Sequence, residues 1–443
     1  MMSRSTHTIC AVTRAVVKQV LAYTGGLLLV VSPSRVCAQP AHEHKQQEQQ
    51  PAEAQPPPDW PVVIAQLLQD MHERPGHAQT RDQLATAYNN YGVSLSEQQK
   101  WDLAIQQLEE AIKLDDTKEA FRNNLSSIYL AQAQDAYKGH QANGALEALD
   151  KALALNPDSA QAYGLRGQIE YDRQKLKEAQ AAWKRAVDID PTQAELAKRL
   201  AQVTQELPVE SKFEKLSQVY FDLRYEEQLE HPIGFDIRDA LLDARRSVGA
   251  DFAYWPKHKL VVLIYSAKNF HQLQQETPEW AGGQFDGKIR VPLPSAQLSQ
   301  ATVRQILFHE YTHAVIFDLT NDKCPRWLNE GLAEYEGRTQ LAGSLKRLQS
   351  AFDGQQLIPW QELSGHFSPT APVQEVAAAY EQAYSISVYL VKRCGFWRVR
   401  RLLKAIGDGQ SWETALADTL HMKLAKIEAD WRNWLPELLH ASP

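Results

Sequence analysis

The sequence predicts an α+β protein in which an all-α helical solenoid precedes a domain made of a small sheet plus a helical subdomain. Three observations lead to this prediction. A pattern of alanines around a bulky residue recurs at helical spacing between residues 104 and 186. Short strand-like apolar runs occupy residues 219–292, and helical periodicity dominates the rest of the chain. We place the solenoid at residues 59–208 and the second domain at residues 215–436.

The first 38 residues have the features of a secretory signal peptide. Basic residues such as Arg4 and Arg14 precede an apolar stretch at residues 20–31, and a small residue, Ala38, stands before Gln39. We therefore predict cleavage after Ala38 and a periplasmic or secreted protein without a stable membrane span. The alternative is an uncleaved anchor, although the apolar run is shorter than the ~20 residues that cross a bilayer.

Residues 39–58 contain almost no apolar side chains, which predicts a disordered linker. Loss of the signal peptide would leave 43 of the 47 basic residues against 54 acidic residues. An acidic chain without a basic run is a poor nucleic-acid binder, so we expect no nucleic-acid partner.

Three helix pairs are predicted in the solenoid. In each, two alanines flank one bulky residue on the second helix: Ala104, Leu108 and Ala111; Ala145, Leu149 and Ala152; Ala179, Trp183 and Ala186. The spacing of 34 residues between the last two units resembles tetratricopeptide repeats. That resemblance implies a curved solenoid whose concave face can hold a protein partner, and the alternative is a spacer that supports the second domain. We place seven extra residues of the middle unit in an irregular turn within 132–143, and expect capping helices at 60–71 and 192–207.

The second domain is expected to begin after a boundary at residues 208–215. Strands are predicted at residues 219–225 and 259–265, with a helix at 237–248 between them. A turn and a strand at residues 285–292 follow, ended by a proline.

The stretch from Ala301 to Gly337 contains the run HEYTH, which has the pattern H-E-x-x-H. Its context is an amphipathic helix with one stripe predicted to face a core, made of Val303, Ile306, Leu307, Ala314 and Phe317. His309 and His313 are then one turn apart and can both reach one Zn²⁺, while Glu310 can reach a water there. A third ligand is needed, and the segment WLNEGLAEY supplies a candidate after Pro325.

The order HEYTH followed by WLNEGLAEY resembles the gluzincin metallopeptidases, the group of thermolysin and aminopeptidase N. The resemblance implies that Glu330 is the third ligand and that one Zn²⁺ per chain is the cofactor. It also implies that Glu334, one turn later, orients His309. In that fold the strand before the metal helix lines the cleft, so we assign residues 288–291 to bind an extended peptide; the alternative is an ordinary inner strand.

A helix is predicted from Val373 to Cys394, before Gly395. With N-E-G-L-A-E-Y upstream, its Y-x-Q-A-Y-x-x-x-x-Y-L run is similar to the small bacterial peptidase-MA-like domain often joined to tetratricopeptide repeats. The resemblance covers about residues 215–436 and implies that a tyrosine on this helix stabilises the oxyanion. Spacing does not separate Tyr380 from Tyr384, and both could instead be core residues.

Two cysteines, Cys324 and Cys394, remain after signal cleavage. In an oxidising compartment they either form a disulfide or stay buried as free thiols.

Together these features predict a secreted or periplasmic zinc metallopeptidase. It would hydrolyse a peptide or protein substrate with metal-activated water and with Glu310 as general base, and its repeats would serve protein interaction. Two alternatives share the same sequence features. One is an envelope interaction or scaffold protein whose metallopeptidase-like domain is inactive or structural, and the other is a zinc amidase that acts on cell-wall peptides.

Overall fold

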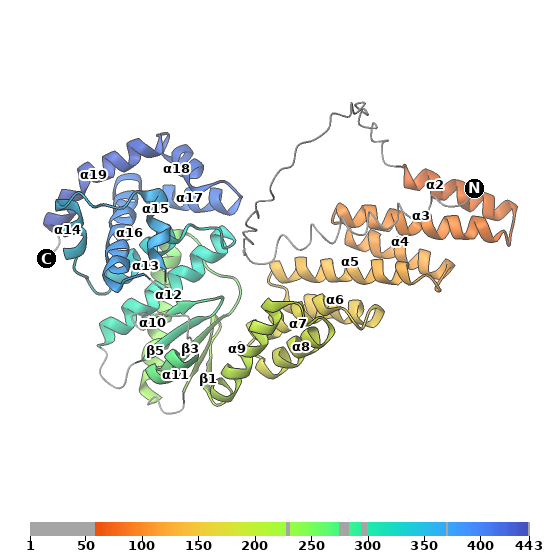
Figure 1. Ribbon diagram of the computed structural model, residues 1–443, viewed down its shortest axis with the longest axis horizontal. Coiled ribbons are helices and arrows are strands. Elements are labelled where there is room, and N and C mark those ends of the chain that lie inside the picture. Colours follow the sequence, from red (N-terminus) through yellow and green to blue (C-terminus); the bar gives the residue numbers. More distant parts are fainter. Residues whose placement is uncertain (1–57, 227–230, 274–282, 294–298, 369–370, 442–443) are drawn as a thin grey trace, which may run out of the picture. The chain divides into compact units, whose positions relative to one another are not determined.

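The computed structural model describes residues 58–226, 231–273, 283–293, 299–368 and 371–441 (Figure 1). The signal peptide predicted at residues 1–38 lies outside these ranges, as does the linker predicted at 39–58 except for Pro58. Among the described helices, none combines the length and the apolar character that a membrane crossing requires. Residues from Asp59 onward form one compact unit.

The N-terminal part of this unit is built from helices that pack in consecutive pairs (Figure 1). They are α2 (Trp60–Glu73), α3 (Ala78–Glu97), α4 (Trp101–Leu114), α5 (Glu119–Lys138), α6 (Ala142–Leu155), α7 (Ala160–Asp172), α8 (Leu176–Ile189) and α9 (Ala194–Glu210). The alanines and bulky residues of the repeat pattern are all buried at the contacts between paired helices. The predicted helix pairs are therefore confirmed.

The extra residues of the middle unit lengthen a helix and do not distort a turn. Helices α3 and α5 have 20 residues each, whereas α7 has 13. The turns after them are alike, because Gln99, His140 and Gln174 all adopt the left-handed backbone, with φ of 58°, 57° and 57°. The predicted irregular turn is wrong: seven residues are about two helical turns, so their addition preserves the register of the helix faces.

A five-stranded sheet opens the second part, in the order β1-β2-β3-β5-β4. Its strands are β1 (Glu214–Ser217), β2 (Phe221–Tyr225), β3 (Leu260–Ser266), β4 (Gln284–Phe285) and β5 (Ile289–Leu293). The three inner strands are parallel, and β1 and β4 pair antiparallel at the two edges. Strand β1 was not predicted, because its sequence EKLS is short and mostly exposed and has no apolar alternation.

The segment expected to bind an extended peptide is not at an edge. Strand β5 pairs with β3 on one side and with β4 on the other, so the assignment of residues 288–291 to the cleft edge is wrong. Gly287 adopts φ of 93°, which a tight hairpin requires, and thereby folds β4 back along β5. The edge strand on this side is β4.

Different helices cover the two faces of the sheet. Ile289 and Val291 face α10 (His231–Phe252) and α12 (Gln300–Thr320) in the main core. The other face packs on α11 (Ala267–Leu273) and on α9, the last helix of the repeats. Lys288 and Arg290 point to this second face and are fully buried there.

A helical subdomain follows helix α12. It contains α13 (Arg326–Arg338), α14 (Lys346–Asp353), α15 (Trp360–Leu363), a 3₁₀ turn (Ser364–Phe367), α16 (Val373–Cys394), α17 (Phe396–Gly407), α18 (Trp412–Leu420) and α19 (Leu424–Ala441). Helix α16 begins and ends at the predicted residues. Of the two alternatives for Cys324 and Cys394, the structure has the free thiols.

Candidate metal centre

Helix α12 is the element around which the centre is built. The Ser299 side chain accepts a hydrogen bond from the Thr302 backbone N–H and caps its start, and Asn321 ends it with φ of 50°. Only part of the predicted apolar stripe faces the core: Phe317 is 37% exposed. The reason is that α10, α13, α17 and the sheet surround most of the helix, so that its burial does not follow a single stripe.

Helix α13 starts after the turn at Pro325 and lies against α12, which brings Glu330 to the two histidines. The Nε2 atoms of His309 and His313 are 3.1 Å apart. Each of them lies 3.6 Å from Oε2 of Glu330. The three predicted ligands therefore form a nearly equilateral triangle of donor atoms.

This triangle fits a zinc ion. Bonds of about 2.0–2.1 Å in tetrahedral geometry place neighbouring ligand atoms about 3.3 Å apart, which lies within the observed range. Two imidazoles and one carboxylate are a donor set that zinc favours in sites with one position left open. The residues present thus suit the metal that the sequence implies.

Both imidazoles are held from the side opposite to the triangle. Nδ1 of His309 lies 3.4 Å from Oε1 of Glu334, the contact that the resemblance implied. Nδ1 of His313 lies 2.9 Å from Oδ1 of Asn329, a partner that the sequence reasoning missed. Its only signal was its position directly before Glu330. Such contacts fix the ring orientation and leave both Nε2 atoms directed at Glu330.

The carboxylates of the cluster attract positive charge, either a proton on His309 or a metal ion. Burial by itself lowers the pKa of His309, but the carboxylates of Glu330 and Glu334, 3.6 Å and 3.4 Å away, outweigh it and hold the pKa well above its ordinary value. Burial by itself raises the pKa of Glu330, but its contacts with His309 and His313 bring it to about 2. The carboxylate is therefore ionised at neutral pH, as a metal ligand must be.

Glu310 lies beside the triangle with an unused carboxylate oxygen. It is 4% exposed, and its Oε2 atom has no hydrogen-bond partner among the described residues. Gly283, just before β4, packs against it so closely that a Cβ there would lie 2.5 Å from Oε1. Burial raises the pKa of Glu310 to about 7. This carboxylate can therefore gain or lose a proton near neutral pH.

The structure separates the two tyrosines of α16. Tyr380 lines the same cleft as the ligands, and burial together with the neighbouring Glu330 carboxylate raises the pKa of its phenol. Tyr384 is not among the residues that line this cleft, and the Arg338 guanidinium lies 4.4 Å from the centre of its ring.

The cleft has a volume of about 1140 Å³. Small-molecule sites have volumes of about 300–1,000 Å³, so this cleft has room for an extended chain. The edge strand contributes to the lining through Gln284 and Phe285, and α16 contributes Val373 and Tyr380 from another side.

Comparisons with known proteins agree with this architecture. Residues 239–437 match the Peptidase MA superfamily, and residues 130–194 match the tetratricopeptide repeat. No curated protein matches the chain.

Three solved structures are similar to part of the chain, each with a TM-score of 0.21. The first TPR of Spaghetti (RPAP3) bound to the HSP90 peptide SRMEEVD is 25% identical and covers 28% of this chain and 93% of its own. The first TPR domain of human RPAP3 is 25% identical and covers 29% of this chain and 94% of its own. The Arabidopsis OM64 TPR domain is 19% identical and covers 28% of this chain and 96% of its own. The two family matches and the order of helices and strands together show that the chain has an N-terminal tetratricopeptide-like helical region followed by a Peptidase MA domain.

Proposed function

We propose that this chain is a zinc metallopeptidase of the periplasm or the extracellular space that hydrolyses peptide bonds. The observation that carries the proposal is the triangle of His309, His313 and Glu330 donor atoms beside the unpartnered carboxylate oxygen of Glu310. The location is supported by the signal-like composition of residues 1–38.

His309, His313 and Glu330 would hold the ion. Zinc, when bound, supplies a Lewis acid that polarises a carbonyl group and lowers the pKa of water. Glu334 and Asn329 keep the two imidazole rings in the orientation that binding needs.

Glu310 acts as the general base in this proposal. Its free oxygen accepts the proton of the attacking water, and the resulting acid returns that proton to the leaving amine. The raised pKa suits both steps, because a group with a pKa near the working pH can take and give a proton with little cost.

Tyr380 is the proposed donor to the oxyanion. Burial raises the pKa of its phenol, so the hydroxyl keeps its proton at neutral pH and can donate a hydrogen bond as the carbonyl oxygen gains charge. Strand β4 is the proposed docking edge, since it is an edge strand of the sheet and its residues line the cleft. An extended peptide can add to such an edge through backbone hydrogen bonds.

The repeat region is proposed to bind a protein. Its match to the tetratricopeptide repeat supports this role, because stacked helix pairs create extended concave surfaces.

The decisive experiment compares wild type with Glu310→Gln. The amide keeps the shape of the side chain but cannot accept the proton, so zinc content should stay at one ion in the triangle while peptide turnover falls by ~10²–10⁴-fold. Zinc is measured by mass spectrometry and turnover with a peptide library that includes cell-wall peptides. Glu375→Gln is the control, because Glu375 is exposed in the first turn of α16 and should be neutral.

Equal turnover in Glu310→Gln and wild type would refute the mechanism. A wild-type protein that holds zinc in the triangle but cleaves nothing in the library would favour the scaffold function. Cleavage confined to the cell-wall peptides would favour the amidase.

A further inference from the structure

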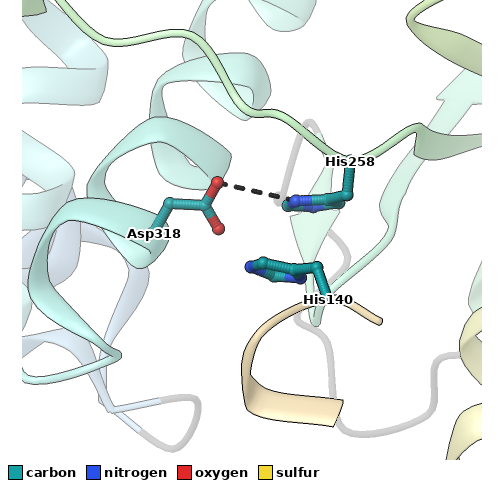
Figure 2. A group of neighbouring side chains, drawn as sticks. All are labelled: His140, His258 and Asp318. Atoms are coloured by element: carbon teal, nitrogen blue, oxygen red, sulfur yellow. Dashed lines mark ion pairs between the residues drawn. The ribbon is translucent and has the colours of Figure 1, made fainter. Parts of the chain in front are cut away.

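A second group of metal-binding side chains lies apart from the cleft. His140 comes from the turn between α5 and α6, His258 from the loop between α10 and β3, and Asp318 from the last turns of α12. Each offers one ligand atom, and these three atoms lie within 4.8 Å of one another. Figure 2 shows the Asp318 carboxylate facing the edges of the two imidazole rings, which lie one above the other.

The three side chains are close neighbours but do not form a closed hydrogen-bonded network. The rings of His140 and His258 are stacked with centroids 4.2 Å apart and planes 15° apart. Nδ1 of His258 is 3.7 Å from Oδ2 of Asp318, which is too long for a hydrogen bond. That buried nitrogen has no hydrogen-bond partner among the described residues. Closing the group around zinc needs movements of roughly 1 Å, because ligands of one ion lie about 3.3 Å apart. At least one of the stacked rings must also rotate, since an imidazole nitrogen binds an ion in the plane of its ring.

The surroundings of these three side chains favour the binding of a cation. The Asp318 side chain is only 3% exposed, and the Tyr254 hydroxyl donates to its Oδ2 atom at 3.1 Å, which fixes the carboxylate. His140 is exposed, which gives an ion access from solvent.

The repeat itself places His140 at this point. The corresponding left-handed turn positions of the other two units are Gln99 and Gln174. The Gln174 side chain accepts a hydrogen bond at 2.7 Å from the Lys288 ammonium on the strand side of the second domain. The same turn position thus contacts that domain in two successive units, and in the middle unit it presents an imidazole to His258.

We propose that His140, His258 and Asp318 form a second site for a divalent transition-metal ion of the zinc type. The ion would join the repeat region to α12, the helix that also carries His309 and His313. Its role is structural: it would fix the middle repeat against the metal helix, and it does not depend on the proposed peptidase activity.

The test measures zinc in the full chain after dialysis against metal-free buffer and reloading with Zn²⁺. Wild type should hold two ions per chain. His140→Asn should hold one, and asparagine tolerates the left-handed backbone of this turn. His309→Ala/His313→Ala should also hold one, and the triple variant none. His440→Ala is the control, because His440 is exposed on α19 and should leave two ions.

A second measurement keeps the test independent of activity. Addition of Zn²⁺ should raise the Tm of His309→Ala/His313→Ala, and the further change His140→Asn should abolish that rise. His258→Gln serves if His140→Asn does not fold. One ion in wild type that His140→Asn retains and His309→Ala/His313→Ala loses would overturn the second site and leave the peptidase site standing. One ion in wild type that His309→Ala/His313→Ala retains and His140→Asn loses would support the second site and remove the basis of the proposed peptidase.

Discussion

At the scale of single residues, the chemistry of the candidate centre is concentrated on few atoms. The proximity of His309, Glu310 and His313 could be predicted from sequence, because their spacing places them together on a helix. The approach of Glu330 was expected only from the resemblance. The residues that hold these side chains in place could not be predicted. Asn329 and Gly283 act through contacts across the fold, with His313 and Glu310, and neither lies at a spacing that periodicity can read.

The two tyrosines of α16 give a prediction at this scale. Tyr380→Phe removes the hydroxyl from the cleft, so kcat should fall by ~10²–10³-fold with KM little changed, as expected for loss of an oxyanion donor. Tyr384→Phe keeps the ring on which Arg338 packs and should remain within a few-fold of wild type. Steady-state kinetics on a cleaved peptide, with zinc content measured in parallel, would check both. A larger loss in Tyr384→Phe than in Tyr380→Phe would contradict the assignment.

At the scale of elements, the sequence predicted the helices better than the sheet. Helix pairs carry their signal in local periodicity, and burial of the repeated alanines follows directly from it. The position of a strand within a sheet depends on partners that lie far along the chain. For that reason the edge position of residues 288–291, which was expected from the resemblance, is wrong, and the short strand β4 covers β5 in the structure.

The close crossing of α7 and α8 gives a prediction at this scale. A Cβ on Gly167 would collide with the indole ring of Trp183, whose Nε1–H donates to the Gly164 carbonyl at 3.0 Å and so cannot turn away freely. Gly167→Ala should therefore lower the free energy of unfolding by about 1–3 kcal/mol. Gly144→Ala on α6 meets no atom within 4 Å and should instead stabilise the protein by about 0.5–1 kcal/mol. Urea unfolding followed by circular dichroism measures both, and equal effects would show that the crossing is not tight.

At the scale of the whole molecule, a buried ionic network joins the repeats to the sheet. Nη2 of Arg290 on β5 lies 3.2 Å from Oε1 of Glu206, and Nη1 lies 3.0 Å from Oε1 of Glu210, both on α9. All three side chains are at most 1% exposed. Burial lowers the pKa of neighbouring Lys288 to about 8, so Arg290 is the cation that stays charged under all ordinary conditions. This pairing could not be predicted from the sequence, since its partners are about 80 residues apart.

Loss of that cation should uncouple the two parts. Arg290→Met leaves Glu206 and Glu210 buried without their charge partner, so the free energy of unfolding should fall by about 3–5 kcal/mol. Thermal unfolding should change from one transition to two, because the repeats no longer gain stability from the sheet. Adding Glu206→Gln and Glu210→Gln removes the unpaired charges and should recover most of the loss. Arg432→Met, which breaks the surface pair with Glu428, should cost less than about 1 kcal/mol. A single transition in Arg290→Met at nearly the wild-type temperature would mean that apolar packing alone holds the repeats on the sheet.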